Sequence, residues 1–168
     1  MKNLYRVKAR HLAAAVLASG LGSAALSAEA PDFTLELPAG LACDFELQID
    51  GYGGNVHTKE FFDDNDDLVR TITAGKGSDL VFTNKESGAK FALKGNGAVT
   101  QSTYNADGSS TNVGTGHNVL ILFPNDVPAG PSTTLYVGRF VYTVDAAGIF
   151  TLQSTSGTST DICAALSD

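Results

Sequence analysis

Two histidines, His57 and His117, are the most versatile chemical groups beyond the first thirty residues. An imidazole can transfer protons, bind a metal or donate a hydrogen bond near neutral pH. Serine-hydrolase chemistry needs a nucleophile on a strained turn, and the sequence holds no Gly-x-Ser-x-Gly motif. Zinc needs three or four ligands at recognisable spacing, and neither histidine has another histidine nearby. Ordinary hydrogen bonding is therefore the favoured role for both side chains.

Residues 63 to 67 carry four carboxylates and one amide. Clustered oxygen atoms suit a hard cation such as calcium, and Asp63, Asn65 and Asp67 have the spacing of cation ligands. The segment departs from an EF-hand loop, because Leu68 occupies the position that needs glycine. A solvated hairpin tip explains the same charges. No cofactor is expected, and weak calcium binding is the alternative.

Aromatic residues offer a possible binding surface, although the chain has no tryptophan. Tyr136 and Tyr142 share their parity with Phe140, whereas Leu135 and Val137 have the opposite parity. Both faces of that strand are therefore apolar, which indicates a central strand with one face on the core. Core packing is the default interpretation of the aromatic face. The alternative is a barrel interior that holds a small apolar ligand, with His117, Tyr136 and Tyr142 as its binding residues.

Apolar residues alternate with polar ones along most of the chain, which predicts an all-β fold. A short helical turn is expected near the C-terminus, at 161–166. Short links between the strands favour an antiparallel meander that closes into a barrel, and a two-sheet sandwich fits the same pattern. About ten strands are expected, at 43–49, 55–62, 68–73, 80–84, 90–94, 98–105, 110–115, 119–123, 134–144 and 149–154.

The first thirty residues have the pattern of a secretory signal peptide. Four basic residues precede an uncharged apolar run at 12–27, which is too short to span a bilayer comfortably. Residues 31–168 then form a single secreted, extracellular domain without a membrane anchor. Because export leads to an oxidising compartment, Cys43 and Cys163 are expected to form a disulfide.

The chain is acidic, and the expected export makes it more so. The formal net charge is −7 for the whole sequence. It becomes −10 from Pro31 onward, where seven basic and seventeen acidic residues remain. A negative surface of this size repels phosphate backbones and anionic headgroups, so nucleic acids and bare membranes are poor partners.

The longest irregular connection, at 124–131, contains three prolines and is a second candidate for a functional loop. It follows the expected strand at 119–123, whereas His117 precedes that strand. Five extended residues span about 17 Å, so one small-molecule site cannot use both ends. The His117 end is preferred, because Gly114 and Gly116 leave the backbone open to close approach.

The segment Gly116–Asp145 reads GHNVLILFPNDVPAGPSTTLYVGRFVYTVD. It resembles small exported all-β proteins of bacteria that have no assigned function. The resemblance implies a fold and a compartment, and it supplies no catalytic motif that could be transferred.

Two classes of function fit these observations. The first is a non-enzymatic extracellular binding or interaction module, whose partner is an unidentified small molecule or extracellular protein. Export, acidity, a β framework and the lack of catalytic motifs all favour it. The second is a small barrel enzyme of cyclase, isomerase or hydrolase type, which would use His57 or His117 with Glu60 or a tyrosine.

Overall fold

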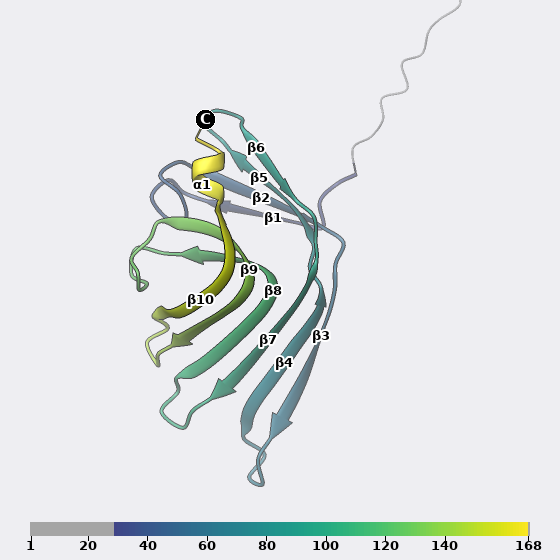
Figure 1. Cartoon of the computed structure of the whole chain (residues 1–168), viewed down its shortest axis with the longest axis vertical. Helices are drawn as coiled ribbons and strands as arrows, with labels where there is room; N and C mark the ends of the chain where they lie inside the picture. Colours follow the sequence, from purple (N-terminus) through teal and green to yellow (C-terminus); the bar gives the residue numbers. More distant parts are fainter. Residues whose placement is uncertain (1–28, 168) are drawn as a thin grey trace, which may run out of the picture.

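The computed structural model describes residues 29–167, which fold into two antiparallel β-sheets and one short helix. The predicted signal peptide lies outside the described residues, apart from its last two positions. The smaller sheet has the order β1 (Phe33–Leu37), β2 (Leu47–Tyr52), β5 (Asp79–Asn84), β6 (Lys90–Leu93). The larger sheet has the order β10 (Phe150–Asp161), β9 (Ser132–Val144), β8 (Ser110–Leu122), β7 (Gly97–Tyr104), β4 (Leu68–Lys76), β3 (Asn55–Phe62). The helix α1 (Ile162–Ala165) follows β10 directly (Figure 1).

The prediction of an all-β fold with a C-terminal helical turn is confirmed, but the predicted meander is wrong at three links. β2 pairs with β5, and β4 pairs with β7, so the chain changes sheet after β2, β4 and β6. A short glycine-containing link can connect strands of two different sheets as readily as it can form a hairpin within one sheet. The predicted barrel is not confirmed, because no closed barrel is found among residues 29–167.

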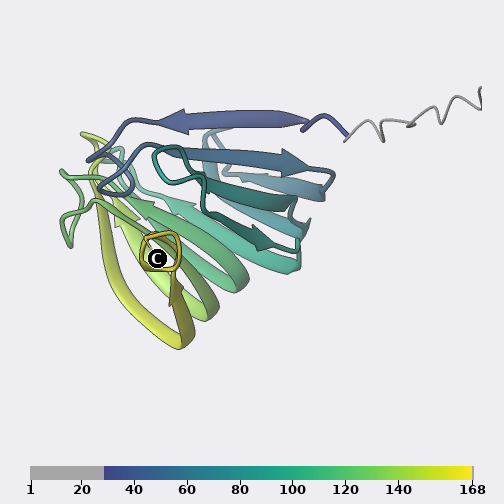
Figure 2. The ribbon, with the colours of Figure 1, turned by 90° about the horizontal axis from the view of Figure 1, so that it is seen from above.

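The main core lies between the small sheet and one half of the large sheet. Leu47, Ile49 and Phe82 project from β2 and β5, and Leu135 projects from β9. Leu47 and Phe82 are completely buried, and burial of each such side chain stabilises the fold by about 1.5–3 kcal/mol. Figure 2 shows the small sheet lying across the large one, with β1 and β10 on opposite sides of the molecule.

No helix of the described chain is long and apolar enough to cross a membrane.

The C-terminal helix is held against this core by a disulfide and by hydrogen bonds. Cys43 and Cys163 are bonded, as predicted, with 5.6 Å between their Cα atoms. Asn84 donates its side-chain amide to the Leu166 carbonyl at 3.1 Å, and both residues are buried. Thr133 donates its hydroxyl to the Ala42 carbonyl at 3.0 Å. The end of the chain is thereby fixed to the segment that precedes β2.

A row of small residues crosses the large sheet. The strand register places Gly75 beside Ala98, Ala98 beside Gly116, Gly116 beside Gly138, and Gly138 beside Gly157. The four glycines of this glycine row have φ values of 148°, 88°, 146° and 98°, a region that side chains disfavour. Glycine within strands commonly marks a bend or a close backbone approach. Figure 1 shows β8, β9 and β10 curving strongly along their length.

The neighbouring backbones also leave no room for a side chain in this row. A Cβ atom at Gly138 would meet the Ser156 carbonyl, and one at Gly157 would meet the Val137 carbonyl. Conformation and space therefore both require glycine at these positions. The row also divides β8 and β9 into two halves. Residues after Gly116 in β8 and before Gly138 in β9, such as Val119 and Leu135, pack in the main core.

Replacing both Cys43 and Cys163 with serine should lower the melting temperature without changing the far-ultraviolet circular dichroism. The bridge joins residues 120 positions apart. In the chain-entropy model, loss of the bridge gives the unfolded chain more conformational freedom. The free energy of unfolding then falls by up to about 4–5 kcal/mol. Thermal melts with and without reductant measure the effect, with the reduced wild type as the matched control. An unchanged melting temperature in both samples would contradict a stabilising bridge.

Replacing Gly138 with alanine should destabilise the fold by about 3 kcal/mol, because the new methyl group meets backbone at a positive φ. Gly97→Ala is the matched control, since a Cβ atom there meets nothing within 4 Å. The control should change stability by no more than about 1 kcal/mol. Urea unfolding of the two variants measures both values, and equal effects would argue against the glycine row as a requirement of the fold.

Candidate functional site

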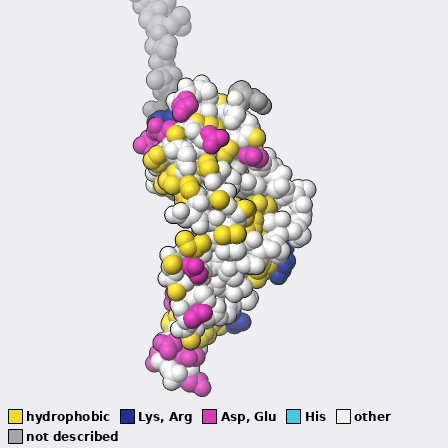
Figure 3. Space-filling model, turned by 90° about the vertical axis from the view of Figure 1, so that its left-hand side faces the viewer, with side chains coloured by type: hydrophobic (Ala, Val, Ile, Leu, Met, Phe, Trp, Pro, Cys, Tyr) yellow, Lys and Arg dark blue, Asp and Glu magenta, His cyan; other side chains and the backbone are white. Residues whose placement is uncertain are grey.

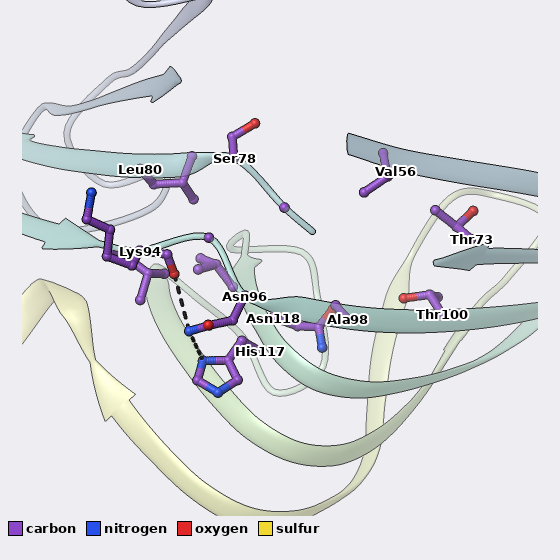
Figure 4. A pocket seen from close by; sticks show the side chains of 14 residues that line it. Val56, Thr73, Ser78, Leu80, Lys94, Asn96, Ala98, Thr100, His117 and Asn118 are labelled. Carbon is purple, nitrogen blue, oxygen red and sulfur yellow. Dashed lines mark hydrogen bonds between the residues drawn. The ribbon is translucent and has the colours of Figure 1, made fainter. Parts of the chain in front are cut away.

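A pocket of about 310 Å³ opens beside His117, next to the links that connect the two sheets. β8 contributes one wall, the links after β4 and β6 contribute a second, and the ends of β3, β4 and β7 complete it (Figure 4). Its lining residues are Val56, Thr73, Gly77, Ser78, Leu80, Leu93, Lys94, Gly95, Asn96, Ala98, Thr100, His117, Asn118 and Val119. The structure thus places the preferred sequence candidate, His117, at a pocket.

Asp79 organises the two links that form the wall of the pocket. Its carboxylate accepts hydrogen bonds from Lys94 Nζ at 2.8 Å and from the Gly95 amide at 2.8 Å. The Lys94 hydrogen bond, followed by that of Gly95, lowers the pKa of Asp79. The Gly77 amide donates to the Asn96 carbonyl at 3.2 Å, and the Gly77 carbonyl leaves no room for a Cβ atom at Gly95. These contacts fix the backbone from which Asn96 projects.

Asn96 sets the tautomer of His117. Its side-chain nitrogen lies 3.5 Å from the Lys94 carbonyl and 3.2 Å from His117 Nδ1 (Figure 4). A carbonyl can only accept, so the amide nitrogen of Asn96 is the donor, and it also donates to His117 Nδ1. In the neutral imidazole, this hydrogen bond places the proton on Nε2.

The rest of the lining is mainly apolar, with hydroxyl and amide groups at its margin. Leu80, Leu93 and Val119 supply apolar surface. The Asn118 amide donates to the Thr115 carbonyl at 3.1 Å, which leaves its oxygen able to accept a hydrogen bond from a ligand. Such a lining can enclose an apolar body while orienting it with a few polar contacts.

Tyr136 and Tyr142, the other predicted ligand-binding residues, are not among the residues that line this pocket. They belong to an aromatic row with Phe140 and Phe150. Successive ring centroids in the order Tyr136, Phe140, Tyr142, Phe150 lie 6.3, 5.8 and 4.3 Å apart. Burial raises the pKa of the Tyr142 hydroxyl. The structure therefore does not bring these tyrosines together with His117.

The proline-containing connection is hydrogen-bonded to the start of β10, which carries Phe150 of this aromatic row. The Asp126 carboxylate accepts from the Phe123 amide at 2.7 Å and from the Phe150 amide at 3.2 Å. Val127 donates to the Phe150 carbonyl at 2.9 Å and accepts from the Leu152 amide at 2.7 Å. The connection thus joins the end of β8 to the start of β10. None of its residues lines the His117 pocket.

His57 and Glu60 lie exposed on β3 and do not line the pocket. The lining also contains no carboxylate. A histidine and carboxylate pair for general acid and base chemistry is therefore not assembled at His117 among residues 29–167.

The acidic tip lies at the end of the hairpin formed by β3 and β4 (Figure 1), and acidic side chains gather at the lower end of the molecule in Figure 3. The Asp63 carboxylate accepts from the Asn65 amide at 2.8 Å and from the Asp67 amide at 3.0 Å. These bonds shape the turn. Within the described range, no three histidine, cysteine or acidic residues are grouped to hold a metal ion. Calcium binding at Asp63, Asn65 and Asp67 stays a prediction.

Sequence reasoning did not identify Asn96, Thr73 or Thr100 as parts of the site. Asn96 follows a strand and lies between Gly95 and Gly97, which reads only as a turn. The two threonines are ordinary strand residues. Only the pairing of β4 with β7 and the change of sheet after β6 bring them to His117.

The Asp63 turn should contribute stability that depends on pH. Hydrogen bonds from the amides of Asp67 and Asn65 lower the pKa of Asp63 in the folded protein. The contribution is therefore full above the ordinary aspartate pKa of about 4, and it is lost as the pH falls through the lower folded value. Asp63→Ala should lower the melting temperature near pH 7 more than Asp64→Ala does, and the difference should shrink in acid. A difference that persists in strong acid would contradict this cause.

The comparisons with known proteins supply no function for this chain. No protein-family model, curated protein or solved structure matches it. Its function is therefore inferred from the residues of the pocket and from the surfaces that the fold leaves open.

Proposed function

We propose that this chain is a secreted, non-enzymatic binding protein, which holds a small neutral molecule in the pocket beside His117. The observation that carries the proposal is the position of His117 at a mainly apolar pocket, where Asn96 is hydrogen-bonded to its Nδ1 atom. A volume of about 310 Å³ lies at the lower end of the range for small-molecule sites. The ligand is accordingly the size of a small ring compound.

The charges around the pocket favour a neutral ligand. Lys94 is the only ionised side chain among the residues that line the described pocket, and Asp79 holds its ammonium group at 2.8 Å. A charged ligand would lose its hydration in the pocket without meeting an unpaired opposite charge. That desolvation costs free energy. A neutral ligand avoids that cost.

The polar groups favour a ligand that both donates and accepts hydrogen bonds. His117 and the side-chain oxygen of Asn118 are polar groups of the lining that can hydrogen-bond to a ligand. Leu80, Leu93 and Val119 would contact the apolar part of the ligand. A hydroxylated ring, such as a sugar or a phenol, combines both properties.

The Cys43–Cys163 disulfide supports the proposal of secretion, because disulfides persist in oxidising compartments. The acidic composition also suits an exported, soluble domain. The enzyme alternative has less support, because no carboxylate lines the pocket near His117 in the described chain.

A thermal-shift screen of neutral monosaccharides, polyols and simple phenols tests the proposal. Binding to the folded state raises the melting temperature by mass action. For a compound that does so, His117→Ala should weaken binding by roughly tenfold, as expected for the loss of one hydrogen bond of about 1.4 kcal/mol. Isothermal titration calorimetry measures the affinity.

His57→Ala is the matched control, because it removes an exposed imidazole outside the pocket. It should leave the affinity unchanged, and both variants should keep the wild-type circular dichroism. The proposal fails if no compound of these classes raises the melting temperature, or if the two histidine variants lose affinity equally.

A further inference from the structure

β10 leaves a long, uncharged strand edge open to solvent. It is the last strand of the large sheet, and β9 is its neighbour on one side only (Figure 2). Val127 covers the beginning of the other side through its hydrogen bonds with Phe150 and Leu152. Beyond that cover, the nine residues Gln153–Asp161 are all exposed. Their sequence, QSTSGTSTD, carries no charge before its final residue.

The other three sheet edges have features that discourage strand pairing. β3 carries Lys59 and Glu60 and has a register shift near its end. β1 has five residues and β6 has four, with Lys90 on the latter. Charges, short length and bulges are the usual means by which proteins block edge association. Residues 154–160 of β10 carry no charge, and the register shift of this strand lies before them, between Leu152 and Ser154.

We propose that β10 pairs with β10 of a second copy of this chain, antiparallel and about a two-fold axis at Gly157. Gly157 is the central residue of the exposed run Gln153–Asp161. The three residues on each side of it are serine or threonine. An antiparallel pair centred there therefore aligns the two exposed runs over their full length.

The pairing is self-complementary residue by residue. Thr155 lies opposite Ser159 of the second copy, and Ser156 lies opposite its Thr158. Hydroxyl side chains across an antiparallel pair can hydrogen-bond to each other. No like charges meet along the strand.

The bend of the sheet is compatible with this axis. Gly157 belongs to the glycine row, where the strands of the large sheet curve. A two-fold axis perpendicular to the sheet at the bend keeps both copies curved toward the same side. The backbone ladders of the two large sheets then join without a change of curvature.

The partner that pairs with β10 is a second copy of this chain, because the exposed edge of β10 is complementary to itself. Symmetric closed dimers are the commonest soluble oligomers, and their interface uses the same patch on both subunits. The acidic surfaces of the two copies repel each other at a distance. Salt screens this repulsion, so self-association should strengthen with ionic strength.

Sedimentation equilibrium of the purified protein tests the proposal, from micromolar to near-millimolar concentration. The wild type should reach twice the monomer mass, more readily at high salt. Thr155→Lys/Ser159→Lys puts lysines opposite each other across the axis, and should weaken self-association by roughly tenfold or more. Thr155→Lys/Ser159→Asp puts a lysine opposite an aspartate, and should restore the dimer.

Gln101→Lys/Thr111→Lys is the matched control, because both residues are exposed on inner strands of the sheet. It should dimerise as the wild type does, and circular dichroism verifies that each variant is folded. A wild type that stays monomeric throughout would overturn the proposal. So would open-ended larger species, which indicate pairing of β10 with a different edge, or equal losses in the double-lysine variant and its control.

Discussion

The large sheet depends on the close approach of backbones at the glycine row. At Gly75, Gly116, Gly138 and Gly157, a Cβ atom would meet the backbone of an adjacent strand. The same residues adopt positive φ values that let the strands change direction. One steric constraint, repeated across neighbouring strands, thus sets the curvature of the sheet. That curvature determines what each half of the sheet can pack against.

The two halves of the large sheet use different packing partners. Beyond the row, Val119 and Leu135 pack against the small sheet in the main core. On the other side, Phe140 is 2% exposed, although it is not part of that core. Its ring lies against Gly114, where no side chain would fit, and it belongs to the aromatic row. A small domain thereby forms two apolar clusters from one curved sheet.

Local patterns predicted most of the strands and turns, because period-two alternation and turn chemistry act over a few residues. The segment 55–62 was predicted with its exact bounds. β1 was missed, since its residues Phe33 and Leu35 remain exposed at a sheet edge. β8 was predicted as two strands, because Gly116 looks like a break but is a bend within one strand.

The site was predictable only in part, because pairing between distant strands decides it. His117 could be selected from its type and from the glycines before it. Its hydrogen bond to Asn96 depends on the change of sheet after β6, which no local pattern encodes. Tyr136 and Tyr142 were selected by parity, which places them on one face but does not say what that face encloses.

The disulfide also changes what proteolysis can do to this molecule. Cys43 and Cys163 are 120 positions apart in the sequence, so the chain between them is closed into a covalent ring. A protease that cuts once inside this ring, for example at the projecting tip near Asp64, opens a loop but releases no fragment. The two pieces of the cut chain stay joined by the disulfide, whose cysteines lie in the main core. A nicked copy therefore persists as one molecule until a second cut or a reductant separates its parts.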